Sequence, residues 1–501
     1  MSIQRSFFLS FTVPPLSRPA WISPRVMKTE ALAGLVVAIA LIPEAISFSI
    51  LAGVDPRVGL FASFTMAVTI AFTGGRPAMI SAATGAIALI VAPLARDYGL
   101  EYLVAAVILA GVMQVLLAFF GVARLMRFVP RSVMVGFVNA LAILIFLAQL
   151  PYLVDVPWIV YPMVVVGIAI MLLLPRFTTA VPAPLVAVVL LTVAAVSLGW
   201  SVPTVGDQGE LPGGLPILGI PAVPFTFETL RIIAPFALAM ALVGLMESLM
   251  TAKLVDDITD TRSNKTRESW GQGVANIVTG FFGGMGGCAM IGQTMINVKA
   301  SGARTRLSTF LAGVFLMILV VVLGDVVAVI PMAALVAVMI IVAYSTFDWH
   351  SLKSLPHMPK SETIVMVTTV AATVITHNLA IGVVTGVVTA TVLFARRVAH
   401  LVTMTREVAD DGEHVTYEVH GELFFASSND LVYQFQYADD PHWVVIDLSG
   451  AHLWDASTVA ALDAIIYKYE QRGQSVDVLG LNKYSRDLRA RLDGRIPLGH
   501  E

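Results

Sequence analysis

The sequence has few of the features that a soluble enzyme or a nucleic-acid-binding protein needs. Only 13% of its 501 residues are charged, whereas an ordinary soluble domain carries roughly a quarter. The formal net charge is −3 and no run of Lys and Arg occurs, so we expect no nucleic-acid partner. We also find no nucleophile with a base at a usable spacing and no cofactor motif. Neither enzymatic activity nor a cofactor is expected.

Cysteine is almost absent as well. The one cysteine, Cys288, excludes an intrachain disulfide framework, and nine scattered histidines offer no metal-ligand spacing. Apolar residues are abundant instead, with 57% hydrophobic residues and a mean hydropathy of +0.83. Crossing the ~30 Å hydrocarbon core takes about 20 apolar helical residues, because every backbone polar group must be satisfied within the segment. Most of the chain is therefore expected to be helical and surrounded by lipid.

Glycine, proline and charged residues divide the apolar sequence into segments that we interpret as membrane spans. Residues 1–28 precede them as a cytoplasmic lead-in, because the apolar stretch Phe7–Phe11 is too short for the core of a signal peptide. The sequence predicts fourteen spans, at 29–50, 56–73, 80–95, 101–120, 131–150, 157–174, 182–199, 229–252, 269–282, 289–298, 305–323, 327–345, 361–376 and 378–400.

The loop charges indicate the orientation of these spans. Cytoplasmic loops carry an excess of Lys and Arg, and such residues gather in alternate loops here, whereas the long loop from Ser201 to Thr229 contains none. We therefore expect a multi-pass protein of the bacterial inner (plasma) membrane with both termini in the cytoplasm. The residues expected on that side include Arg76, Arg124, Arg127, Arg131, Arg176, Lys253, Arg262, Lys265, Arg267, Arg304, Arg306, Lys353 and Lys360.

A short internal repeat indicates two related halves. The stretches Gly74–Ile80 and Gly286–Ile291 both contain two glycines followed by Ala-Met-Ile, and they precede the third and tenth spans. An odd number of spans in each half makes the halves inverted relative to each other, as in many secondary transporters. The sequence thus predicts a transmembrane domain at 29–400, with one repeat of seven spans at about 29–199 and the other at about 229–400.

The composition changes after about residue 400, where charged residues become dense. Short strand and helix patterns alternate there, which predicts a small soluble α/β domain at 401–501. We expect a short helical linker at Val398–Glu407 leading into it. The predicted strands are Tyr417–Phe425, Trp443–Leu448 and Ser475–Leu479, and the predicted helices are Ser457–Gln471 and Tyr484–Leu492.

Two acidic residues stand inside apolar spans, Glu44 in the first and Glu247 in the eighth. An ionisable residue costs about 2.5–3.5 kcal/mol within a membrane, so it marks a functional hypothesis. Pro43 should kink or break the first helix next to Glu44, and a buried carboxyl there is a candidate proton carrier. The alternatives are that Glu44 bonds carbonyls freed by the kink, and that Glu247 braces two helices.

Glycine-rich segments open two of the spans. Gly74–Pro77 leads into the third span and Gly280–Gly287 into the unusually short tenth. Short, glycine-interrupted segments at matching places in two repeats are typical of a central binding site. Two helix N-termini meeting there would offer free N–H groups and partial positive charge, an arrangement that selects anions. The alternative is that the glycines only permit close helix packing.

Several stretches resemble the sulfate permease (SulP) family of anion transporters. Gly34–Ser63 is similar to the first-span signature, and later family blocks are matched by Ala241–Leu249, Gln272–Gly284 and Asn297–Ser308. The resemblance covers nearly the whole chain. It implies two inverted seven-span repeats, a core subdomain moving against a gate subdomain, a homodimer and a C-terminal STAS domain, which residues 405–501 resemble in a short form.

The resemblance also implies an anion site. Many members of the family have an arginine where this chain has Gln293, and commonly a glutamine where it has Glu44. The change weakens binding of a bare dianion, and protonation of Glu44 would relieve the repulsion. The implied substrate-binding residues are Phe48, Thr84, Gly85, Ala86, Ala289, Met290, Ile291, Gly292 and Gln293.

These residues predict a secondary transporter that works by alternating access and carries a small carboxylate or dicarboxylate together with a proton. Glu44 and Glu247 are the coupling candidates. The alternatives are a sulfate transporter, a sodium-coupled bicarbonate transporter that uses Glu247 in its cation site, and an uncoupled anion channel. A membrane-anchored scaffold or sensor would need neither the buried carboxyls nor the broken helices.

One further segment resembles a regulatory site. Asp455 and Ser457 lie at a predicted helix start that is similar to the segment phosphorylated in related anti-sigma antagonists. This resemblance implies a cytoplasmic regulatory partner acting through the STAS domain. The alternative is that either residue only caps the helix, since Ser and Asp are common N-cap residues.

Overall fold

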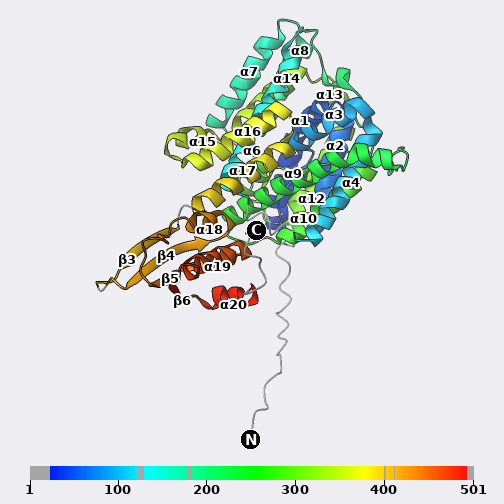
Figure 1. The fold of residues 1–501 in the computed structure, drawn as a ribbon. Helices are drawn as coiled ribbons and strands as arrows, with labels where there is room; N and C mark the ends of the chain where they lie inside the picture. The colour runs from blue at the N-terminus through cyan, green and yellow to red at the C-terminus, as the bar shows by residue number, and fades with distance from the viewer. Residues whose placement is uncertain (1–22, 122–128, 179–181, 400–401, 411, 493–501) are drawn as a thin grey trace. The chain divides into compact units, whose positions relative to one another are not determined.

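A computed structural model describes residues 23–121, 129–178, 182–399, 402–410 and 412–492. The chain divides into two compact units, one ending at Gly386 and one beginning at Val387. Figure 1 follows the chain through a large helical unit and then a smaller unit built on a sheet. The mostly helical fold with a small C-terminal α/β domain confirms the predicted fold class.

The first unit consists of helices with very short strands. Its first part contains α1 (Pro24–Leu51), α2 (Pro56–Thr73), β1 (Ser81–Ala82), α3 (Gly85–Tyr98), α4 (Leu100–Phe119), α6 (Arg131–Leu147), α7 (Val160–Leu173) and α8 (Ala183–Ser197). Its second part contains α9 (Phe227–Thr259), α10 (Lys265–Phe281), β2 (Cys288–Ala289), α11 (Ile291–Met295), α12 (Arg306–Val322), α13 (Gly324–Ala328), α14 (Met332–Thr346), α15 (Trp349–Ser354) and α16 (Lys360–Thr376). Helix α17 (Leu379–Ala399) crosses the boundary between the units.

Each of the fourteen predicted spans overlaps a helix of the structure. Within the described residues, seven helices are long and apolar enough to cross a membrane by length and composition alone. The number of spans and the inverted relation of the two halves stay predictions. The main local difference concerns the third and tenth segments, which begin with strands β1 and β2 instead of helix.

Helix α1 does not break at its proline. It is helical without interruption from Pro24 to Leu51, so the prediction of a break at Pro43 is wrong, and a kink there stays a prediction. Pro43 leaves the carbonyl of Ile39 without its backbone donor, and one turn later the Ser47 hydroxyl donates to the Pro43 carbonyl at 2.7 Å. The helix packs closely against α12 at Gly34. A Cβ at this position would lie only 2.9 Å from the Ser308 carbonyl oxygen.

Strands β1 and β2 pair with each other in the centre of the first unit. They run antiparallel, with Ser81 opposite Ala289 and Ala82 opposite Cys288. A Cβ on Gly287 would lie 2.0 Å from the Ala82 carbonyl oxygen, so only glycine permits this approach. Because α3 and α11 begin directly after the strands, the pairing brings the N-termini of these two helices together.

The second unit contains a four-stranded sheet in the order β3-β4-β5-β6. β3 is antiparallel to β4, and β4, β5 and β6 are mutually parallel neighbours. The strands are β3 (Thr403–Val408), β4 (His414–Leu423), β5 (Trp443–Leu453) and β6 (Ser475–Leu479), and the helices are α18 (Phe425–Leu431), α19 (Ala456–Glu470) and α20 (Lys483–Leu492).

The predicted helical linker at Val398–Glu407 is wrong over its second half. Residues Thr403–Val408 form strand β3 and pair with β4. Exposed and partly buried side chains alternate along this strand, which is the period of a strand and not of a helix. The partner strand decides the outcome, since it supplies backbone hydrogen bonds that an isolated linker helix would lack.

A buried carboxylate organises the core of the second unit. The Asp440 side chain is fully buried and accepts hydrogen bonds from the Tyr417 and Tyr469 hydroxyls, each at 2.6 Å. Arg406 of β3 donates to the other carboxylate oxygen at 2.7 and 2.9 Å. Burial, with the adjacent Asp440, raises the pKa of both tyrosines above the ordinary value. Asp440 therefore ties β3 and β4 to α19.

We expect Asp440→Asn to loosen this unit. The amide presents N–H groups where the tyrosines need acceptors, and an unsatisfied buried group costs roughly 1–3 kcal/mol. Hydrogen exchange of the full chain should show faster exchange in β3, β4 and α19. The matched control is Asp439→Asn, an exposed neighbour, which should leave exchange unchanged. Equal exchange in the two variants would contradict the role of Asp440.

Candidate functional site

A cavity of about 150 Å³ lies where α3 and α11 begin. Helices α1, α6, α9 and α14 complete its wall. Its lining is mainly apolar, with two carboxyl groups and a few hydroxyl groups. The lining residues are Glu44, Phe48, Thr84, Gly85, Phe137, Val138, Leu141, Ile145, Glu247, Met250, Met290, Ile291, Gly292, Val342, Ser345 and Thr346.

The two helix starts carry backbone N–H groups that are free to bind a ligand. Within the described residues, no acceptor is recorded for the N–H groups of Gly85 and Ala86 in α3, or of Ile291, Gly292 and Gln293 in α11. Gly85, Ile291 and Gly292 line the cavity. Helix α11 continues without a gap as a π-helix over Ile296–Ala300. The start of a helix concentrates unsatisfied donors and partial positive charge, which favours anions.

Gly85 allows an aromatic ring to cover the first of these helix starts. A Cβ at Gly85 would lie 2.9 Å from Cε1 of Phe48. Phe48 is itself buried, and both residues line the cavity. The ring forms an apolar wall beside the free N–H groups, which excludes water and strengthens electrostatic interactions there.

Glu44 is bonded to a neutral partner. The Gln293 amide nitrogen donates to Glu44 Oε1 at 3.0 Å. Gln293 is 1% exposed and its own amide oxygen has no partner within the described residues. No ion pair of Glu44 and no bond from it to a carbonyl near Pro43 is recorded in the described part of the chain. The recorded partner of Glu44 thus belongs to α11 and not to a carbonyl of α1. The role of Glu44 in proton coupling stays a prediction.

Glu247 is bonded to the only cysteine of the chain. The Cys288 thiol donates to Glu247 Oε2 at 2.9 Å, and its sulfur lies 3.1 Å from the Thr84 hydroxyl. The neighbouring Ser248 hydroxyl accepts the N–H of Ala289 at 3.1 Å. Consecutive residues of α9 thus hold both residues of β2, and Cys288 links the Glu247 carboxyl to Thr84 at the start of α3.

The structure brings most of the predicted site residues to one place. Six predicted substrate-binding residues and both coupling candidates line the cavity: Phe48, Thr84, Gly85, Met290, Ile291, Gly292, Glu44 and Glu247. Three others, Ala86, Ala289 and Gln293, are buried directly beside it. Their role in binding stays a prediction.

Two parts of the site were missed by the sequence analysis. Helices α6 and α14 contribute one wall of the cavity, including Phe137, Leu141 and Ser345. No sequence signal marks these residues, since apolar and small side chains occur throughout every span. Cys288 was also missed, although its position just before the repeated Ala-Met-Ile triplet was a usable signal.

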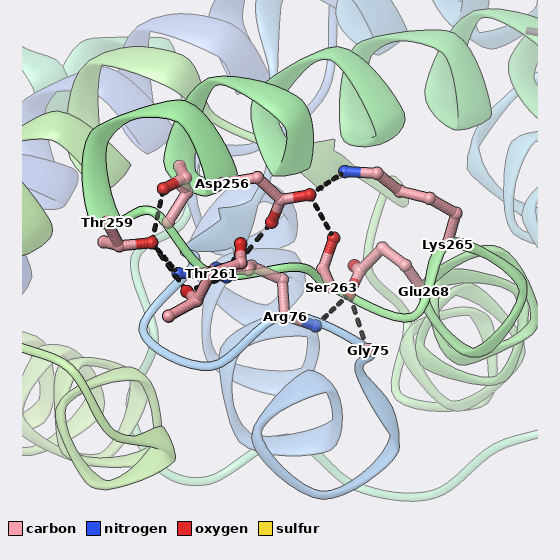
Figure 2. A network of polar contacts seen from close by, with 9 residues as sticks. Gly75, Arg76, Asp256, Thr259, Thr261, Ser263, Lys265 and Glu268 are labelled. Carbon is pink, nitrogen blue, oxygen red and sulfur yellow. Dashed lines mark hydrogen bonds and ion pairs between the residues drawn. The ribbon is translucent and has the colours of Figure 1, made fainter. Parts of the chain in front are cut away.

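A second polar network holds the approach to β1, as Figure 2 shows. The Arg76 guanidinium donates to Asp256 Oδ1 at 3.0 Å and to the carbonyl and hydroxyl of Thr261 at 3.1 and 2.8 Å. Asp256 also accepts from Ser263 and Lys265 at 2.9 and 2.8 Å. Burial lowers the pKa of Arg76, and Asp256 opposes the shift. The end of α9 is thereby fixed to the loop that precedes β1.

The same loop is held from the other side by Glu268 of α10. Its Oε2 accepts the N–H groups of Gly75 and Arg76 at 2.7 and 2.9 Å (Figure 2). Gln272, one turn further along α10, donates to Glu268 Oε1 and to the Ser81 hydroxyl of β1. A Cβ at Gly75 would meet the Asn264 carbonyl oxygen at 2.0 Å. Gly75, the second glycine of the pair Gly74–Gly75, is therefore needed for the close packing of this loop against α10.

We expect Arg76→Ala to destabilise the protein. The loss leaves Asp256 with fewer donors at a mostly buried position, at a cost of about 1–3 kcal/mol, and the melting temperature in detergent should fall. Lys265→Ala is the matched control, because Lys265 bonds the same carboxylate from a more exposed position and should cost less than about 1 kcal/mol. A melting temperature of Arg76→Ala at or above that of the control would contradict this account.

The predicted regulatory residues occupy a helix start in the second unit. The Asp455 carboxylate accepts from the N–H and hydroxyl of Thr458 and from the N–H of Phe425. Asp455 is the N-cap of α19, as the alternative interpretation predicts, whereas Ser457 is exposed. A regulatory role of either residue stays a prediction.

Apolar helices long enough to span a membrane, two helices that begin in the buried interior, and a cavity with free N–H groups beside them are features expected of a multi-pass anion transporter. Family models agree with this class. The description "Sulfate permease family" matches residues 27–161 and 156–369, and "STAS domain" matches residues 405–493. The chain belongs to the sulfate permease family and carries a C-terminal STAS domain.

Individual relatives agree with the assignment. The chain is 55% identical over 462 residues to the "Putative sulfate transporter YbaR" of Bacillus subtilis (strain 168), covering 92% of this chain and 96% of that one. It is 24% identical to the "Bicarbonate transporter BicA" of Synechocystis sp., covering 91% and 88%. The fold is similar to that of the murine Slc26a9 anion transporter in the inward-facing state, with a TM-score of 0.81, 16% identity and coverage of 100% and 97%. These relatives are named as transporters and not as enzymes.

Proposed function

We propose that the protein carries a small carboxylate or dicarboxylate together with a proton, by alternating access. The observation that carries this proposal is the content of the cavity. Free N–H groups of two helix starts stand beside two carboxyl groups, Glu44 and Glu247, neither of which has a recorded cation partner in the described part of the chain. An anion enters such a cavity more readily after a carboxyl has bound a proton, since like charges repel at close range in a low dielectric.

Glu44 is the group to which we assign the coupled proton. Its partner Gln293 can serve both protonation states, because a side-chain amide both donates and accepts hydrogen bonds. With Glu44 ionised the amide nitrogen donates, as in the structure. With Glu44 protonated the unpartnered amide oxygen of Gln293 becomes an acceptor after the amide rotates. The Glu44 carboxyl thus has a hydrogen-bond partner in either protonation state.

Sulfate and bicarbonate are the second candidates, supported by the names of two relatives. In a bicarbonate transporter the coupling ion would be sodium, bound with the help of Glu247. The Cys288 thiol bonds Glu247 Oε2, so the other carboxylate oxygen would be the ligand of the cation. An uncoupled channel differs from both in that the anion moves down its own gradient, without help from a proton or sodium gradient.

We further propose the setting of this activity. Residues 29–400 would form the transport domain, with both termini in the cytoplasm of a bacterium, in the plasma membrane. Residues 401–501, including Asp455 and Ser457, would receive regulatory input, and the protein would act as a homodimer. The loop charges and the family membership support these statements.

The test is uptake of radiolabelled oxalate, succinate, sulfate and bicarbonate by the full chain in proteoliposomes, under a proton gradient, a sodium gradient or neither. We expect proton-driven accumulation of a carboxylate. In Glu44→Gln, the uptake driven by the proton gradient should fall about tenfold or more, because an amide cannot carry the proton.

The matched control is Glu228→Gln, which changes an exposed glutamate in the first turn of α9 and should behave as the native protein. Sodium-driven bicarbonate uptake would overturn the proposal in favour of the second candidate. Uptake that neither the proton nor the sodium gradient increases would favour a channel.

A further inference from the structure

The arrangement around Cys288 is not explained by the role of Glu44. Cys288 is fully buried, and its sulfur stands between the Glu247 carboxyl at 2.9 Å and the Thr84 hydroxyl at 3.1 Å. Thr84 is the N-cap of α3, where its oxygen also accepts the N–H of Ile87 at 3.5 Å. The three side chains therefore form one continuous hydrogen-bonded chain from a carboxyl to the start of a cavity-lining helix.

Both ends of this chain face the cavity. Glu247 and Thr84 line it, and Glu247 is 8% exposed. The thiol contacts only Oε2 of Glu247. Within the described residues, the other carboxyl oxygen, Oε1, has no recorded hydrogen-bond partner. An unpartnered oxygen on a carboxyl that is more than nine-tenths buried and lines a cavity points to a ligand or proton arriving from that cavity.

We propose that Cys288 is a positioning residue that transmits the protonation of Glu247 to the Thr84 hydroxyl and so sets the affinity for the anion. The inference rests on the proposed proton-coupled function and adds a second proton-sensitive group to it. The geometry permits two directions of the same hydrogen-bonded chain.

When Glu247 is ionised, the thiol donates to the carboxylate and the Thr84 hydroxyl donates to the sulfur. A hydroxyl has one proton, so Thr84 then has none to offer the cavity. When Glu247 binds a proton, its O–H donates to the sulfur and the thiol turns to donate to Thr84. The Thr84 O–H, still covalently intact, then points into the cavity and donates a hydrogen bond to the anion. One proton is added at Glu247 and no covalent bond to sulfur or to the Thr84 oxygen is broken.

The experiment measures equilibrium binding of radiolabelled oxalate and sulfate to the purified full chain in nanodiscs between pH 6 and pH 8. We expect the Kd of the native protein to be about tenfold lower at pH 6 than at pH 8. In a Glu44→Gln background, which removes the contribution of Glu44, Cys288→Ala cuts the chain. The ratio of the Kd values at pH 8 and pH 6 should then fall to about threefold or less, which is the part left by direct repulsion between Glu247 and the anion. Cys288→Ser should keep the native pH dependence, since a hydroxyl also donates and accepts.

A second pair of variants tests the far end and covers the case in which Cys288→Ala fails to fold. Thr84→Val removes the hydroxyl at nearly constant shape and should flatten the pH profile, whereas Thr84→Ser should keep it. The same comparison in a Glu44→Gln background removes the contribution of Glu44, so that the remaining pH dependence is that of Glu247.

The inference is overturned if, in the Glu44→Gln background, Cys288→Ala keeps the full pH dependence of Cys288. It is equally overturned if Cys288→Ser loses that dependence as Cys288→Ala does, which would make the residue a packing element only. It is also overturned if the native protein binds neither anion or binds with a Kd that does not change with pH. Proton-driven uptake in proteoliposomes decides the proposed function separately, because uptake that is driven by protons while binding is insensitive to Cys288 would reject only the inference.

Discussion

The site depends on the antiparallel pairing of two strands of two residues each. Strands this short make few ladder hydrogen bonds, so side chains from surrounding helices complete the set: Thr294 accepts the N–H of Ile80 at 3.0 Å, Ser248 that of Ala289 at 3.1 Å and Asn276 that of Gly287 at 2.9 Å. In lipid each unsatisfied backbone group costs several kcal/mol. The irregular backbone is tolerated because it is buried in protein and its polar groups are partnered, and the pairing leaves two helix starts free to face a ligand.

The polar residues around this pairing divide into two groups. The first group, which includes Arg76, Asp256 and Glu268, has several charged and backbone partners and holds the loop before β1. The second group, Glu44 and Glu247, has only neutral partners that can reverse their hydrogen bonds, an amide and a thiol. A carboxylate paired with a cation resists protonation, because protonation would leave the cation unpaired. A carboxyl beside a neutral partner that can reverse its hydrogen bond takes up a proton more easily. We therefore propose Glu44 and Glu247, and not the first group, as the proton-sensitive carboxyls.

The sequence was informative where the physics is local. A carboxyl in an apolar span such as Glu44 is visible because it violates composition, and Gly287 is visible because glycines cluster where backbones touch. The sequence could not show that Gln293 bonds Glu44 or that α6 and α14 supply a wall, since neutral and apolar side chains are unremarkable in a span and their neighbours come from distant segments. Two local predictions failed because tertiary contacts outweigh the preference of a short segment. The break predicted at Pro43 does not occur in the packed helix α1, and the second half of the helix predicted at Val398–Glu407 is strand β3, paired with β4.

The central claim is that the anion binds between the starts of α3 and α11. The most direct measurement is a structure of the full chain determined with selenate, an electron-dense oxyanion, at saturating concentration and low pH. The account predicts anion density within hydrogen-bonding distance of the N–H groups of Gly85 and of Ile291 or Gly292, beside Phe48. Density at another place in the first unit, or an empty cavity while binding is detected in solution, would contradict it.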